Sequence, residues 1–158
     1  MMTVVSLVLA ILAVLVLVYA QRWRSESHGA RICRLFGLDP AEFELVGTDL
    51  GGSKDKVYLK GDGLAGVPDA VFRHRSTRAI LIGEAKSRRF NGAVSRYEEY
   101  QVALYMGLAR RRYRVPVSAL IRYGCGQLVP LELDPDAYSE LVRLIPRYRQ
   151  VAKSLSLA

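Results

Sequence analysis

Cysteine is scarce in this chain of 158 residues, and its two thiols, Cys33 and Cys125, lie far apart and outside any CxxC pair. The sequence therefore carries no evident zinc or iron–sulfur site. It also offers no disulfide framework, which is compatible with a reducing compartment. Internal repeats and low-complexity stretches are missing as well, so the chain is expected to form one ordinary domain.

Charge is missing from the start of the chain, since no charged side chain lies before Arg22. Residues 3–20 contain no glycine or proline either, and they are just long enough to cross about 30 Å of hydrocarbon as a helix. Trp23 suits a membrane interface, and Arg22 and Arg24 suit its cytoplasmic side. The pattern predicts a transmembrane helix over 1–21, a basic juxtamembrane linker over 22–38 and a domain over 39–158. The expected location is the inner (cytoplasmic) membrane, single-pass, with the N-terminus out and the domain in the cytoplasm.

A cleaved signal peptide is the competing interpretation of this segment. Val18-Tyr19-Ala20 resembles a cleavage site, and cleavage would make the protein secreted. The segment lacks a basic start, however, and its apolar run is longer than the usual signal core. The arginines directly after the site would also resist export, so the sequence favours the anchor.

Basic residues dominate the remaining domain. The chain has 23 Lys and Arg against 15 Asp and Glu, a net charge of +8, and all of it lies beyond residue 21. A small domain with this charge attracts polyanions, either nucleic acid or an anionic surface, although a merely solvated surface would look the same.

The order of expected elements is helix, three strands, helix, two strands, helix. Asp39 and Pro40 look like the N-cap and first position of a short helix over 41–45. Strands are expected over 56–60, 69–73, 78–86, 117–123 and 128–133, and helices over 95–112 and from Pro135 on, with Pro146 breaking or kinking the last one. This order predicts an α/β fold with a mixed sheet flanked by helices.

Two carboxylates and a lysine are predicted to converge within this sheet. Glu84 and Lys86 are two residues apart at the end of an apolar strand, so they share one face of it. Asp69, after Pro68, would lie beside Glu84 if the two strands form a hairpin. Buried charges at such a place are costly unless they are paired or bind a metal. Asp69 and Glu84 are suitable ligands for Mg²⁺ or Mn²⁺, and Lys86 could orient a water activated by that metal.

The ordered set of motifs resembles the PD-(D/E)XK nuclease superfamily. Val67-Pro68-Asp69 is followed by Glu84-Ala85-Lys86, and Gln101 and Tyr105 resemble the QxxxY motif of its RecB-like branch, which includes the CRISPR-associated RecB-like exonucleases. The resemblance covers roughly residues 41–133. It implies a restriction-endonuclease-like sheet core and a Mg²⁺-dependent nuclease, with Asp69 and Glu84 on the metal. It also implies that Gln101 and Tyr105 contact nucleic acid or order the catalytic groups.

A third metal ligand and the nucleic-acid contacts are less well defined by sequence. Many relatives carry an acidic residue or histidine on the first helix, and here Glu42 or Glu44 could serve, with Glu44 preferred. Arg88 and Arg89 directly follow the catalytic strand and could hold a phosphate backbone, although an ordinary flexible loop would look similar.

The expected function is therefore hydrolysis of DNA phosphodiester bonds by a membrane-tethered, metal-dependent nuclease. The alternative is an inactive nuclease-fold module that binds or scaffolds partners at the membrane. Intact Asp69, Glu84 and Lys86 favour activity, whereas a missing third carboxylate would favour the inactive module. Endonuclease or exonuclease action, RNA as the substrate and homo-oligomerisation all stay open.

Overall fold

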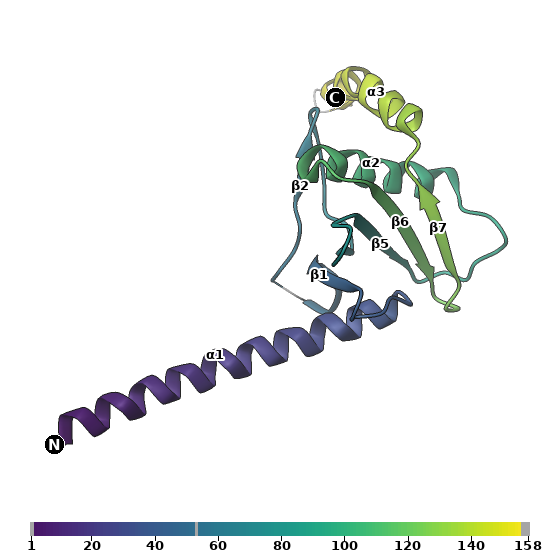
Figure 1. The fold of residues 1–158 in the computed structure, drawn as a ribbon. Coiled ribbons are helices and arrows are strands. Elements are labelled where there is room, and N and C mark those ends of the chain that lie inside the picture. The colour runs from purple at the N-terminus through teal and green to yellow at the C-terminus, as the bar shows by residue number, and fades with distance from the viewer. Residues whose placement is uncertain (1, 53, 156–158) are drawn as a thin grey trace.

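The structure is a computed structural model that describes residues 2–52 and 54–155. It has three layers with a further helix outside them: α1 lies below a sheet, α2 lies above it, and α3 packs on α2 (Figure 1). The elements are α1 (Met2–Leu35), β1 (Phe43–Thr48), η1 (Leu50–Gly52), β2 (Leu59–Gly61), β3 (Leu64–Gly66), β4 (Ala70–His74), β5 (Ile80–Lys86), α2 (Arg96–Tyr113), β6 (Val117–Tyr123), β7 (Leu128–Glu132) and α3 (Pro135–Leu155).

The main sheet has five strands in the order β1-β4-β5-β6-β7. β5 and β6 are parallel and are joined through α2, whereas every other neighbouring pair is antiparallel. The strands β2 and β3 form a separate hairpin beside α2. The predicted α/β fold with a mixed, helix-flanked sheet is therefore confirmed.

The alternation of side chains along β5 divides the core into two parts. Ile80 and Ile82 are buried under α2, in a cluster that includes Val102 and Met106. On the opposite face, Leu81 packs toward the end of α1. Successive strand residues point to opposite faces, so the residues at even positions of β5, Glu84 and Lys86 among them, belong to the face that α2 covers.

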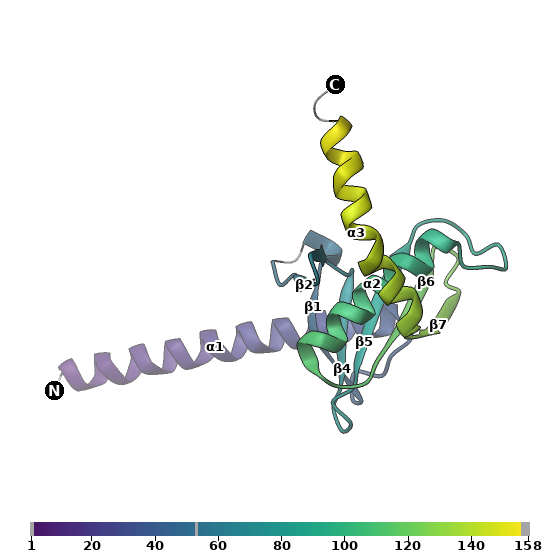
Figure 2. The same ribbon diagram turned by 90° about the horizontal axis from the view of Figure 1, so that it is seen from above.

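The end of α1 covers the other face of the sheet. Ile32, Cys33 and Phe36 are buried there, and the rings of Phe36 and Phe72 meet edge to face with their centroids 5.3 Å apart. Gly37 follows with a positive φ of 67°, the left-handed conformation that commonly ends a helix at glycine. Residues 11–19 of α1 are exposed, and this part of the helix projects away from the sheet (Figures 1 and 2).

The predicted transmembrane helix is not supported. Among residues 2–52 and 54–155, no helix combines the length and the apolar character needed to cross a membrane. The apolar run is not a separate span followed by a linker, because α1 continues through the charged positions Arg22, Arg24 and Glu26 as far as Leu35. The predictions of a span over 1–21 and of a single-pass location at the inner membrane are therefore wrong, and most of the expected linker over 22–38 is helical.

The predicted helix over 41–45 is also wrong. Asp39 does cap a turn, because its Oδ1 accepts a hydrogen bond from the Ala41 N–H at 2.8 Å. The chain then leaves the turn as β1, which pairs with β4 in a register that sets Glu44 opposite Arg73. Strand pairing thus overrides the helical preference of the local sequence.

The later elements follow the sequence more closely. β6 has the predicted bounds, and α2 begins after Ser95, whose side chain and that of Glu98 form a reciprocal capping box. Helix α3 continues through Pro146 and does not break there. It is attached to the body by Tyr138, whose ring lies against Gly107 of α2 and whose hydroxyl donates to Asp62 at 2.8 Å.

Candidate functional site

The register of β4 and β5 brings the two predicted carboxylates together. Ala70 pairs with Gly83, so Asp69 lies opposite Glu84 at the next position of the antiparallel pair. Directly opposed residues share a face of the sheet, with Cβ atoms about 5 Å apart. β5 continues beyond this point to Lys86, supported by β6 on its other side. The site therefore lies where β4 begins and β5 is left with one neighbouring strand.

The Asp69 side chain continues the hydrogen bonding between β4 and β5 beyond the last backbone pair, Ala70 and Gly83. Its Oδ2 accepts the Ala85 N–H at 2.7 Å. Its backbone carbonyl accepts the hydroxyl of buried Thr48 at 2.6 Å and the Asp49 N–H at 2.9 Å. Pro68, which precedes it, has no backbone N–H that would need a partner here. These contacts hold the Asp69 backbone from β1 and its side chain from β5.

Glu84, Lys86 and Gln101 form a closed triangle of hydrogen bonds. Lys86 Nζ donates to Glu84 Oε1 at 2.9 Å and to Gln101 Oε1 at 2.8 Å. Gln101 Nε2 donates to the same Glu84 Oε1 at 2.9 Å. Lysine can only donate, so the Gln101 amide must present its oxygen to Lys86 and its nitrogen to Glu84. α2 thus fixes the orientation of a carboxylate that belongs to the sheet.

The two oxygens of Glu84 are satisfied very unequally. Oε1 accepts two hydrogen bonds, whereas Oε2 is buried and has no hydrogen-bond partner. The backbone N–H of Asp69 lowers the pKa of the Glu84 carboxyl. It does not, however, meet the geometry of an ordinary hydrogen bond to Oε2. Buried polar atoms in proteins are nearly always paired, so an unpaired carboxylate oxygen indicates a missing cationic or hydrogen-bonding partner.

The environment works against the charged state of both carboxyls. Burial raises the pKa of Glu84, and the nearby negative charge of Asp69 raises it further. Burial likewise raises the pKa of Asp69, against the opposing effect of the Ala85 N–H and of Lys86. A bound divalent cation would relieve both effects, because it compensates the charge and supplies the partner that Oε2 lacks.

The residues present therefore fit one hard divalent cation between Asp69 and Glu84. Hard oxygen donors suit Mg²⁺ or Mn²⁺, and Mg²⁺ is commonly held by one or two carboxylates with water completing the shell. Within the described part of the chain, no three His, Cys, Asp or Glu residues converge closely enough to hold a metal. The protein would thus supply two ligands in the arrangement seen here.

Metal affinity is expected to fall as the pH is lowered through the raised pKa values of Asp69 and Glu84. Both groups must lose their protons to bind the cation, so protons compete with it at a higher pH than for ordinary carboxyls. Without metal, the same shifts make the folded state less stable as pH rises through that interval. Calorimetric titration with Mn²⁺ should show weaker binding at pH 5 than at pH 7.5, with proton release. Equal affinities without proton release would contradict the assignment.

Tyr105 lies one turn after Gln101 on α2 and closes the inner side of the site. Its hydroxyl accepts the Gln101 Nε2 at 3.2 Å, and its ring lies against Gly66, where a Cβ atom would be 2.3 Å from the ring. Tyr105 is buried. The contacts of Gln101 with Glu84, Lys86 and Tyr105 order the side chains of the candidate site.

Glu44 is not a third ligand in this structure. It lies opposite Arg73, several strand positions from Asp69, and its carboxylate contacts three guanidinium groups, those of Arg73 at 3.0 Å, Arg75 at 3.7 Å and Arg78 at 3.8 Å. The preference for Glu44 assumed a first helix at this point. Since the segment is a strand, Glu44 is neutralised by arginines at the far end of β4. Glu42 precedes the same strand, in the turn after Asp39.

Arg88 is held by a buried carboxylate rather than directed outward. Its Nε and Nη2 donate to Glu98 at 2.9 and 2.5 Å, and its guanidinium lies 4.8 Å from the centre of the Tyr123 ring. Glu98 is 4% exposed and also accepts from Ser95 and Tyr123. The contacts with Arg88 and Ser95, chiefly that with Arg88, lower the pKa of Glu98 to about 2. The neighbouring Arg89 is exposed and remains suited to a phosphate.

Sequence reasoning missed this Arg88–Glu98 pair, although one signal for it was present. Ser95 and Glu98 are three apart at the start of an apolar helix, the spacing of a capping box. The pair joins the loop after Lys86 to the first turn of α2, one turn before Gln101. It therefore ties together the two elements that carry the site.

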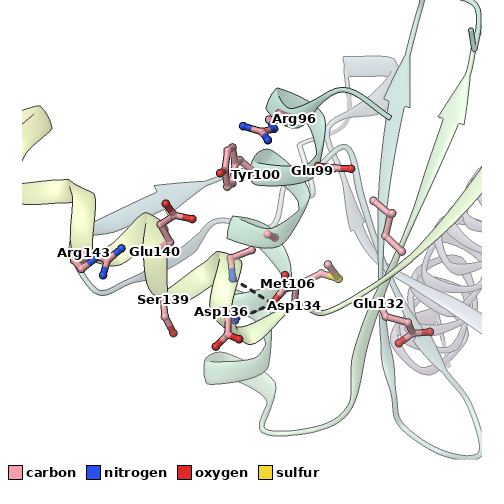
Figure 3. Close-up of a pocket in the computed structure, with 13 residues that line it drawn as sticks. Arg96, Glu99, Tyr100, Met106, Glu132, Asp134, Asp136, Ser139, Glu140 and Arg143 are labelled. Atoms are coloured by element: carbon pink, nitrogen blue, oxygen red, sulfur yellow. Dashed lines mark hydrogen bonds between the residues drawn. The ribbon is translucent and has the colours of Figure 1, made fainter. Parts of the chain in front are cut away.

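A groove of 1010 Å³ lies elsewhere, between α2, α3 and the end of β7. Figure 3 shows Arg96, Glu99 and Tyr100 on its α2 side and Glu140 and Arg143 on its α3 side. None of the predicted site residues lines it. One of its carboxylates, Asp134, caps α3 by accepting the N–H of Asp136 at 2.9 Å. The groove is therefore separate from the candidate catalytic site.

Comparisons with known proteins give no family for the chain. It matches no protein-family model, and no curated protein is significantly similar to it. One solved structure, described as the crystal structure of SSO0001, is 16% identical, with a TM-score of 0.42. The alignment covers 61% of this chain, which spans about half (47%) of the length of that one. The chemistry of the site must therefore be argued from its own residues.

Proposed function

We propose that the chain is a divalent-metal-dependent nuclease that hydrolyses DNA phosphodiester bonds. The observation that carries this proposal is the buried, unpartnered Oε2 of Glu84 on the same face as Asp69. A carboxylate pair that served only the fold would be expected to have both oxygens satisfied. The adjoining Lys86 supplies a cation where phosphate chemistry requires one.

Each side chain of the site has a definable task. Asp69 and Glu84 hold the cation through oxygens on neighbouring strands. Gln101 keeps Glu84 Oε1 engaged, which leaves Oε2 for the metal. Lys86 uses two of its three donors on Glu84 and Gln101 in the described contacts, so a third can orient the attacking water or a phosphate oxygen. When bound, the cation would lower the pKa of that water and neutralise charge developing on the phosphate.

The proposal of DNA as the substrate is supported by the charge of the domain. A net charge of +8 favours a polyanion and speeds its encounter with the protein. Arg89, exposed at the loop that follows the catalytic strand, is the residue we expect to contact the phosphate backbone. Arg88 instead acts within the protein, through Glu98.

The alternative is a nuclease-fold module that binds partners without cleaving DNA. One observation favours it: in the described part of the chain, the site combines two carboxylates and no third metal-ligating side chain. Against it stands the Glu84–Lys86–Gln101 triangle, which engages Glu84 Oε1 and leaves the buried Oε2 unsatisfied. A module without catalysis gains nothing from a buried charge of this kind.

The test is cleavage of linear and circular DNA by the full chain, with Mg²⁺, with Mn²⁺ and with a chelator. The account predicts cleavage that the chelator abolishes and that Asp69→Asn reduces by about two orders of magnitude or more, since the cation loses a ligand. Cleavage of the circular substrate would identify an endonuclease.

Glu44→Gln is the matched control, because it also removes one carboxylate from this sheet but lies among arginines away from the site. Its rate should remain close to that of the wild type. Should the folded, Mn²⁺-bound wild type leave both DNA forms intact, the proposal is wrong and the binding module becomes the better account.

A further inference from the structure

We infer that Asp49 is the third carboxylate of the metal site and that Lys56 holds it away from the cation in the metal-free protein. This inference rests on the proposed function, since it concerns the same centre. It identifies an acidic ligand on the chain segment directly after β1.

Strand pairing places Asp49 on the correct face. Thr48 pairs with Ala70, and the Asp49 N–H donates to the Asp69 carbonyl at 2.9 Å, so the pairing of β1 with β4 extends to Asp49 opposite Asp69. Opposed residues of an antiparallel pair point to the same side, with Cβ atoms about 5 Å apart. Asp49, Asp69 and Glu84 therefore occupy neighbouring positions on three adjacent chain segments.

The acidic side chain within β1, Glu44, offers no third ligand. It lies several strand positions from Asp69, opposite Arg73, and its carboxylate contacts three arginines.

Asp49 is engaged in a contact that can be exchanged. Its Oδ1 lies 2.5 Å from Lys56 Nζ, with both side chains more than one third exposed. Ion pairs with this exposure are weak, because water screens both partners. A divalent cation bound by Asp69 and Glu84 offers Asp49 a stronger partner than one solvated ammonium group.

The independent indication that a ligand belongs here is Glu84. Glu84 is 4% exposed, and its Oε2 has no hydrogen-bond partner. A cation that satisfies Oε2 while held by Asp69 would lie on the face of the sheet that Asp49 also occupies. A rotation of the Asp49 side chain away from Lys56 would then complete three protein ligands without a change in the backbone.

The experiment is Mn²⁺ titration by calorimetry of the full chain and of Asp49→Asn, Lys56→Met and the double variant, without DNA. Asp49→Asn should weaken Mn²⁺ binding at least about tenfold. Lys56→Met should tighten it about two- to fivefold, because the competing ion pair is gone. The double variant should bind Mn²⁺ no more tightly than Asp49→Asn, since no carboxylate remains for the loss of Lys56 to release.

The controls separate ligation from simple electrostatics. Lys54→Met removes the same charge from the same exposed loop, and Glu44→Gln removes a carboxylate from β1 itself; neither should change the affinity appreciably. Tightening by Lys56→Met that persists in the Asp49→Asn background would overturn the inference, because Lys56 would then act only through its field. So would wild-type affinity in Asp49→Asn.

The outcomes also distinguish this inference from the proposed function. If Asp69→Asn abolishes Mn²⁺ binding and Asp49→Asn leaves it unchanged, the inference is wrong and the two-carboxylate site stands. If the wild type binds no Mn²⁺, both are overturned.

Discussion

Replacing Lys86 by methionine is expected to reduce the rate of metal-dependent DNA cleavage by about 10²- to 10⁴-fold, the usual contribution of a positioned acid–base or charge-stabilising group. Lys86 Nζ is fixed by Glu84 and Gln101, so it is held in place before substrate arrives. Methionine keeps the length and apolar character of the side chain but cannot donate a hydrogen bond. Single-turnover cleavage at saturating Mn²⁺ measures the loss in the chemical step.

Lys86→Met should still bind the metal, and this distinguishes it from a variant that has lost a metal ligand. Removing a cation next to Glu84 leaves Mn²⁺ affinity unchanged or stronger, whereas Asp69→Asn should weaken it. Lys60→Met is the matched control, because Lys60 is an exposed strand residue on β2. A Lys86→Met variant that cleaves DNA at the wild-type rate would remove Lys86 from the mechanism.

Replacing Arg88 by methionine is expected to lower the free energy of unfolding measurably, because it leaves the buried Glu98 carboxylate without its cation. The loss should be smaller than for a fully buried pair, because the Arg88 side chain is 37% exposed and Glu98 retains Ser95 and Tyr123 as donors. Urea unfolding at pH 7 measures the difference.

Arg89→Met supplies the control for this prediction, since Arg89 is the adjacent, exposed arginine. It should change stability by less than about 0.5 kcal/mol, as surface substitutions usually do, while weakening DNA binding. The effect of Arg88→Met should also depend on pH. The folded pKa of Glu98 is lowered to about 2 from 4.5, so its contribution is fully present above about pH 4.5 and is lost as pH falls toward 2. A difference between wild type and Arg88→Met that stays constant over this range would contradict the ion-pair account.

Strands β4 to β7 and the hairpin that carries the candidate site could be predicted because their signals are local. The apolar run that ends in Glu84 and Lys86 predicts a buried strand, and the turn before it sets the register that brings Asp69 opposite Glu84. β6 and the start of α2 are likewise fixed by apolar periodicity and by the cap at Ser95. At these positions local preference and tertiary structure agree.

The segment around Asp39 shows where local signals fail. Asp39-Pro40 has the residues of a helix start, but the chain makes one turn there and then pairs with β4. That error also led to the preference for Glu44 as the third ligand. A residue on the predicted first helix became a strand residue opposite Arg73, and Asp49 took the place opposite Asp69. The residues of β1 and β4 that pair are at least 22 positions apart in sequence, and their pairing is set by the whole sheet, so composition near Asp39 could not reveal it.

The course of the N-terminal helix and the contact of Arg88 with Glu98 could not be predicted from the sequence for a related reason. An apolar run looks the same in sequence whether or not it continues as a longer helix, and α1 continues to Leu35 and packs its last turns on the sheet. A surface arginine likewise looks available for phosphate until a buried carboxylate ten residues away is placed against it. Both outcomes depend on contacts that the local sequence does not encode.

The most direct test of the metal centre is an anomalous difference map from crystals of the chain grown with Mn²⁺. The account predicts one strong peak within about 2.5 Å of both Glu84 Oε2 and an Asp69 carboxylate oxygen, with Lys86 still bonded to Gln101. A well-ordered site without such a peak at saturating Mn²⁺, or a peak bound elsewhere with Glu84 Oε2 still unpartnered, would contradict the assignment of Asp69 and Glu84 as a metal centre.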